Sequence, residues 1–133
     1  MSVTRGRCLC GHIAFEFEGK INWCGHCHCE SCRRNTSSAV ATFFAVPRSA
    51  YRHTGAEPQA YASSKGVRRL FCGKCGSPIA YEADAYKHEI HFYIGTLENP
   101  AALLPQFHVF YTEKLPWFEI DDDLPRHDRT TAG

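Results

Sequence analysis

The residues most able to do chemistry lie in residues 23–34, WCGHCHCESCRR, where four cysteines and two histidines fall between positions 24 and 32. Cys27, Cys29 and Cys32 are spaced so that one tight loop could bring three thiolates to a single ion. Zinc binds cysteine sulfur at about 2.3 Å, and three protein ligands leave a fourth coordination position for water or substrate. The spacing therefore predicts an open zinc site of the catalytic type on Cys27, Cys29 and Cys32.

Other residues of the same stretch could occupy that fourth position. Cys24 forms a further C-x-x-C pair with Cys27, so it is an alternative fourth ligand that would close the site. His26 and His28 flank Cys27 and would point away from a metal that Cys27 faces. We expect these histidines to be neighbours of the metal site rather than ligands, and the sequence leaves the role of Cys24 open.

Two distant cysteine pairs indicate a second kind of site. They are Cys8-Leu9-Cys10, followed by Gly11, and Cys72-Gly73-Lys74-Cys75, followed by Gly76. In a C-x-x-C-G turn the glycine lets the backbone fold tightly, so that amide N–H groups point at the sulfurs. Four thiolates complete a tetrahedral site with no free position, and metal binding there contributes to folding. We therefore predict a structural zinc on these four cysteines.

The eight cysteines favour metal binding over disulfides because they are clustered in the sequence, and only one residue separates Cys8 from Cys10. The first residues, MSVTRGRCLCGH, contain no apolar run typical of a signal peptide. Without such a run we expect a cytoplasmic protein. Disulfides are rare in reducing compartments such as the cytoplasm, which also favours metal binding.

Composition narrows the class of partner. Hydrophobic residues make up 44% and charged residues 22% of the 133 residues, as in a folded globular protein. A formal net charge of +1 gives no strong field for nucleic acid or an anionic membrane, and no segment is apolar enough to span one. We expect neither a nucleic-acid nor a membrane partner, and we expect one domain over residues 1–133, with a polar, loose tail over residues 125–133.

Hydrophobic periodicity predicts an all-β domain. Ile13, Phe15 and Phe17 alternate with polar or small residues, as in a half-buried strand. A continuous apolar run follows at 39–46, and further strands are expected at 67–72, 78–83, 88–97 and 107–112. Turn signals rich in glycine, asparagine and proline separate them. Only residues 100–104 are expected to form a helical turn, with Asn99 as N-cap.

The order of the motifs resembles that of the glutathione-dependent formaldehyde-activating enzyme family, which also contains centromere protein V. The matching blocks span nearly the whole chain, at residues 8–11, 27–34, 71–79, 95–100 and 115–117. The resemblance implies an all-β, Mss4-like fold known as a β-tent and built on a structural zinc. The chain departs from the family at residues 35–38, where many members carry a glycine, and at Cys24, which is outside the motif.

The resemblance also implies two zinc ions. The structural zinc corresponds to Cys8, Cys10, Cys72 and Cys75, and the second, more labile zinc to Cys27, Cys29 and Cys32. The implied activity is that of a carbon–sulfur lyase or synthase in which a zinc-bound thiol, with glutathione as co-substrate, adds to formaldehyde or a similar small aldehyde.

Glutathione carries two carboxylates, which planar guanidinium groups bind well. Arg33 and Arg34, directly after the last ligand, are the first candidates for this role, and Arg68 and Arg69 are the second. Two alternatives remain open: a non-catalytic zinc-binding interaction module, and a thiol- or metal-handling protein with another substrate. The sequence does not fix the oligomeric state.

Overall fold

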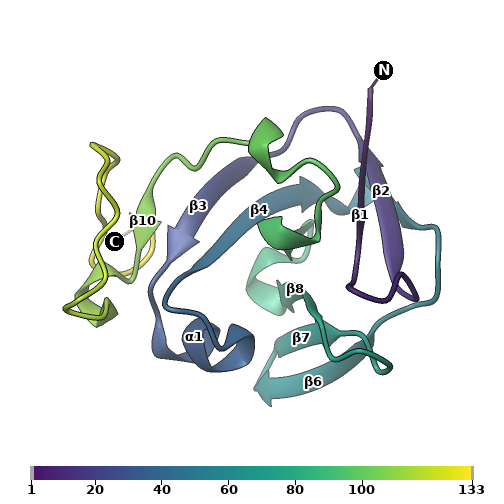
Figure 1. Ribbon diagram of the computed structural model, residues 1–133, viewed down its shortest axis with the longest axis horizontal. Coiled ribbons are helices and arrows are strands. Elements are labelled where there is room, and N and C mark those ends of the chain that lie inside the picture. The colour runs from purple at the N-terminus through teal and green to yellow at the C-terminus, as the bar shows by residue number, and fades with distance from the viewer. Residues whose placement is uncertain (1, 133) are drawn as a thin grey trace.

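The computed structural model describes residues 2–132, which form two β-sheets (Figure 1). The smaller sheet has the order β1-β2-β5, and the larger has the order β10-β3-β4-β9-β8-β7-β6. The strands are β1 (Val3–Arg7), β2 (Ala14–Glu18), β3 (Trp23–Cys27), β4 (Ala41–Pro47), β5 (Tyr51–His53), β6 (Gln59–Ser64), β7 (Val67–Phe71), β8 (Pro78–Ala83), β9 (Glu89–Tyr93) and β10 (His108–Val109). Neighbouring strands are antiparallel except β10 and β3, which are parallel.

Helical structure is short. The one α-helix of residues 2–132 is α1 (Glu30–Thr36), and the 3-10 turns are η1 (Arg48–Ala50), η2 (Asp84–Tyr86), η3 (Ile94–Thr96), η4 (Pro100–Ala102) and η5 (Tyr111–Glu113). In this part of the chain no helix is long and apolar enough to cross a membrane. The predicted all-β fold is confirmed as a mostly-β fold, and α1 is the element that the prediction lacked.

The main core lies between the two sheets, and four phenylalanine rings pack together among its aliphatic side chains. Phe15 of β2 stacks on Phe92 of β9 with ring centroids 3.9 Å apart, and Phe17 packs against Phe44 of β4 at 5.6 Å. All four rings are at most 1% exposed. The predicted inward face of residues 13–17 is thus confirmed. Burying side chains of this size stabilises a fold by about 1.5–3 kcal/mol each.

The predicted strands are confirmed most closely at β2, β4, β7 and β8. Two expected strands are shorter than predicted: β9 stops at Tyr93 because the backbone enters η3, and β10 has only two residues. The helical turn expected at 100–104 is the 3-10 turn η4, and the side chain of Asn99 makes no capping hydrogen bond to it. Pattern reading missed α1, since seven residues are too few for a clear helical period.

The C-terminal segment differs from the loose tail expected from its composition. His108 N–H donates to the carbonyl of Pro125 at 2.8 Å, and His127 N–H donates back to that of His108 at 2.9 Å. Phe110 N–H bonds the carbonyl of Arg129 at 2.8 Å. These bonds hold residues 125–129 along β10, at the end of the molecule opposite the smaller sheet (Figure 1). Composition does not reveal them because the partners come from another part of the chain. Residue 133 lies outside the described residues.

Candidate metal centres

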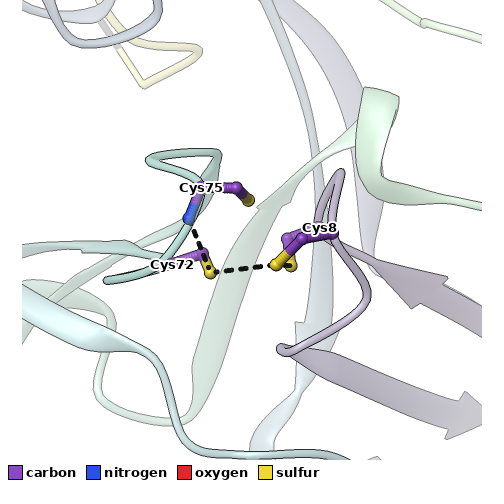
Figure 2. A group of neighbouring side chains, drawn as sticks. Cys8, Cys72 and Cys75 are labelled. Carbon is purple, nitrogen blue, oxygen red and sulfur yellow. Dashed lines mark hydrogen bonds between the residues drawn. The ribbon is translucent and has the colours of Figure 1, made fainter.

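The two distant cysteine pairs come together between the two sheets, as the sequence predicts. We call these four residues the outer set: Cys8, Cys10, Cys72 and Cys75. Cys8 follows β1, and Cys72 follows β7; Figure 2 shows Cys72 and Cys75 on a loop that faces the one carrying Cys8. The Sγ atoms of Cys8 and Cys10 are 3.7 Å apart, and those of Cys10 and Cys72 are 3.8 Å apart. A tetrahedron of sulfurs about 2.3 Å from zinc has edges of about 3.8 Å. The outer set therefore has the spacing of a closed zinc site.

Backbone and hydroxyl groups donate hydrogen bonds to at least three of the four sulfurs of the outer set. Ile13 N–H donates to Cys8 Sγ at 3.3 Å, and the N–H groups of Lys74 and Cys75 donate to Cys72 Sγ at 3.4 Å. Hydrogen bonds from the side chain and backbone of Ser77 lower the pKa of Cys75 to about 5. These donors would remain as partners of the sulfurs when a metal is bound.

The middle cluster consists of Cys27 at the end of β3, Cys29 at the N-cap of α1, and Cys32 in its first turn. Their Sγ atoms all lie within 4.8 Å of one another, so the three thiolates could hold one zinc ion. Cys32 N–H donates to Cys29 Sγ at 3.3 Å. Hydrogen bonds from the thiols of Cys27 and Cys32 lower the pKa of Cys29 to about 2. The three cysteines therefore come from a strand end and a helix start, rather than from one loop as the sequence indicated.

Arg69 of β7 is the cation of the middle cluster. Its Nη1 lies 3.7 Å from Cys32 Sγ and 3.5 Å from the hydroxyl oxygen of Tyr93. Its guanidinium lies over the ring of Tyr81, 5.2 Å from the centroid, and the residue is 7% exposed. Sequence reasoning ranked Arg68 and Arg69 together as second candidates. Arg68 instead bonds Glu82 at 2.8 Å, because consecutive residues of a strand point to opposite faces.

Arg33 and Arg34, the first candidates for the substrate's carboxylates, lie elsewhere. Arg34 is exposed and pairs with Glu30 at 2.8 Å across one turn of α1. Arg33 reaches the backbone carbonyls of His28 at 3.3 Å and Glu113 at 3.4 Å. Each helical residue is rotated by about 100° from the one before, so both side chains turn away from Cys32. The structure does not bring either arginine to the cavity beside the cluster.

Cys24 is not a ligand in this arrangement, which corrects the alternative left open by the sequence. It lies three residues before Cys27 on the same strand, so the two side chains point to opposite faces of β3. Cys24 is fully buried in the core with Phe44 and Phe92, and that burial raises its pKa to about 11. It belongs to neither cysteine cluster of the described residues.

A group of histidines lies near β3 and β10. His28 Nε2 lies 2.8 Å from His108 Nδ1, and His108 Nε2 lies 3.0 Å from Asp122 Oδ2. The ligand atoms of His26, His108 and Asp122 fall within 4.8 Å of one another, but Arg126 also donates to Asp122. The carboxylate is thus already paired, and the group fastens residues 120–127 to β10. His26 and His28 are neighbours of the cysteine cluster and not members of it.

A cavity of about 570 Å³ opens beside the middle cluster. Cys27, Cys29, Cys32 and Arg69 lie on its wall, and Thr130 and Thr131 of the C-terminal segment border it. His91 of β9 is buried, bonds Glu89 at 2.6 Å and also contributes to the wall. The rest of the lining is largely aromatic, with Trp23, Phe43, Tyr81, Tyr86, Phe107 and Phe110. The cysteine cluster is thus reached through an apolar chamber with one cationic side chain.

The sequence model of one protein family, described as glutathione-dependent formaldehyde-activating enzyme, matches residues 3–113. The chain belongs to this family. Its fold is similar to the crystal structure of a Rhodobacter sphaeroides protein solved as a structural-genomics target. The TM-score is 0.62 at 22% sequence identity, over 92% of this chain and 98% of that chain. A search of curated proteins found no match.

Family membership agrees with the geometry of both cysteine sets. Cys8 through Cys75 all lie inside the matched residues, and so does Arg69. The Mss4-like β-tent fold implied by the resemblance is confirmed together with the family. The match ends at residue 113, before the segment that contributes Thr130 and Thr131 to the cavity. That edge of the chamber therefore lies outside the residues that match the family model.

Proposed function

We propose that the protein is a zinc-dependent enzyme of the carbon–sulfur lyase or synthase type. It would join a thiol such as glutathione to formaldehyde or a similar small aldehyde, and it would also cleave the adduct. The observation that supports this most is the three-cysteine cluster beside a cavity, because only three cysteines of the described residues gather there. A closed structural site would have four.

A free thiol with a pKa near 8.5 is only a few per cent ionised at neutral pH. A zinc ion held by Cys27, Cys29 and Cys32 would supply a position at which the thiol binds as thiolate. In the reaction a carbon–sulfur bond forms between the thiol sulfur and the carbonyl carbon. The electron pair of the C=O bond moves to oxygen, which takes up the proton that the thiol released. With formaldehyde the product is S-hydroxymethylglutathione, and the reverse reaction breaks the same bond.

The side chains around the cluster would orient the reactants rather than polarise the carbonyl strongly. Arg69 places a positive charge 3.7 Å from Cys32 Sγ, where it would offset the negative charge of the thiolates. Aromatic side chains form most of the wall of the same chamber, beside the cysteines. Because Arg69 is buried against Tyr81 and Tyr93, its position is fixed before a substrate arrives.

We assign a structural role to Cys8, Cys10, Cys72 and Cys75. A zinc ion on these residues would tie the smaller sheet, through the end of β1, to the larger sheet, through the end of β7. We further propose that residues 1–133 act as one domain in a reducing compartment such as the cytoplasm, where thiolate ligands persist.

The test is zinc stoichiometry in the wild type and in Cys29→Ala, with glutathione titrated onto both. The proposal expects two zinc ions in the wild type, one in the variant, and glutathione binding to the wild type alone. One zinc in both proteins, or equal glutathione binding, would refute the assigned site. Two zinc ions without any thiol binding would favour the non-catalytic interaction module.

A further inference from the structure

The chamber beside Cys27, Cys29 and Cys32 is walled by aromatic rings, whereas formaldehyde has no carbon substituent to place against them. Trp23 packs its ring against Phe107 with centroids 5.6 Å apart, and Phe43 meets Tyr81 edge-on at 6.3 Å. Trp23, Tyr81 and Phe107 are half-buried, so part of each ring remains exposed beside the cavity. An apolar wall next to a reactive centre fits an apolar group on the reacting molecule.

The charges of the chamber limit which part of a glutathione adduct can occupy it. Among the described lining residues Arg69 is the one lysine or arginine, and no aspartate or glutamate lines the cavity. Arg69 is already engaged by Cys32 and Tyr93. Glutathione carries two carboxylates and an ammonium group, and leaving them unpaired in an apolar chamber would be costly. The polar arms of glutathione therefore belong at the mouth, and the chamber is left for the substituent of the aldehyde.

The size of the chamber agrees with this division. About 570 Å³ lies within the range of cavities that enclose whole small-molecule ligands, and a one-carbon aldehyde would leave most of it unfilled. Thr130 and Thr131 border the cavity from outside the residues that match the family. Two residues of the C-terminal segment thus help to shape the chamber.

We propose that the aldehyde partner carries an apolar substituent about the size of one aromatic ring, which lies in the chamber against Trp23, Tyr81 and Phe107. This inference rests on the proposed thiol–aldehyde function and names its substrate class. The aldehyde carbon would be next to the thiol sulfur at the cysteine cluster, with its substituent directed into the aromatic chamber. Formaldehyde would be a poor partner by comparison, because it lacks that contact.

The experiment compares two stable thioether analogues of the adducts, S-benzylglutathione and S-methylglutathione, by calorimetric titration of the zinc-loaded protein. We expect the benzyl conjugate to bind at least about tenfold more tightly, since an aromatic ring leaves water. Phe107→Ala should reduce that ratio about threefold or more, and Phe107→Leu should retain more of it. Tyr86→Ala should also reduce the ratio, because Tyr86 lines the cavity, and its 41% exposure makes the change less disruptive to packing than one at a buried ring. Arg34→Met, outside the chamber, is the control and should leave the ratio unchanged.

Equal binding of the two conjugates by the wild type would overturn the inference and leave the proposed function standing. A benzyl preference that persists in both Phe107→Ala and Tyr86→Ala would overturn the placement of the substituent. Failure of both conjugates to bind would refute the glutathione-linked function itself, and the inference with it.

Discussion

Removing the charge of Arg69 should weaken zinc binding at the three-cysteine cluster by about an order of magnitude. Nη1 of Arg69 lies 3.7 Å from Cys32 Sγ, and both residues are buried. Two full charges at that separation attract by about 4.5 kcal/mol at an effective dielectric constant of about 20. Zinc with three thiolates carries one net negative charge over three sulfurs. Without metal, a hydrogen bond from Cys27 lowers the pKa of Cys32, but Cys29 and burial outweigh it and raise that pKa to about 11, so the Cys32 thiol is neutral. Zinc binding therefore places about a third of a negative charge on the sulfur beside Arg69, which gives about 1.5 kcal/mol, or roughly tenfold in affinity.

The comparison needs variants that separate charge from packing. Arg69→Met keeps most of the side-chain volume over Tyr81 and removes the charge, whereas Arg69→Lys keeps the charge and loses the planar fork. Zinc affinity would be measured by competition with a chromophoric chelator, with circular dichroism to check folding. Arg34→Met is the matched control, since an exposed helix pair such as Arg34–Glu30 contributes little. If Arg69→Met held the second zinc as tightly as the wild type, the argument from charge would be wrong.

Three further changes test other parts of the structure. Cys24→Ala should keep both zinc ions and lose about 1 kcal/mol of unfolding free energy, measured in urea, because it removes one buried sulfur from the core; loss of a zinc ion would contradict its placement there. Cys72→Ala should lose the structural zinc and unfold at a much lower temperature in a calorimetric scan, since metal binding there is coupled to folding; an unchanged melting temperature would argue against that coupling. Asp122→Asn should lower the denaturant midpoint at pH 7. Burial opposes ionisation of Asp122, but hydrogen bonds from Arg126 and His108 lower its pKa to about 2. Its contribution is therefore present above the unfolded value of about 3.9 and is lost only as the pH falls toward 2. The midpoint difference should be the same at pH 7 and pH 5, and shrinkage in that interval would contradict the assignment.

Both cysteine sets could be predicted from the sequence because their information is local. The spacing of Cys8 and Cys10, or of Cys72 and Cys75, constrains ligand geometry within a few residues. Likewise, the alternation of apolar and polar residues at 13–17 indicates directly which face of β2 is buried. In each case the pattern and the physical cause lie in the same short segment.

The cationic side chain of the site could not be predicted from such local patterns. Arg33 and Arg34 are adjacent to a ligand in sequence, but the turn of α1 directs them away from it. Arg69 is 37 residues from Cys32 and reaches it only because β7 lies within the larger sheet. Strand parity was the available signal, since it shows that Arg68 and Arg69 must face opposite sides. It does not show which side carries the cysteines.

The alternation along β3 has a consequence for how this chain can change over evolutionary time. Gly25 and Cys27 face one side of the strand, and Cys24 and His26 face the other. Many single amino-acid substitutions on either side of β3 would affect only the contacts of the substituted side chain. An insertion or deletion of one residue inside β3 would instead exchange the two sides, withdrawing Cys27 from the cluster and Cys24 from the core at once. We therefore expect relatives to vary in residue type along β3 but to preserve its length, and to gain or lose residues in the C-terminal segment, where no such parity applies.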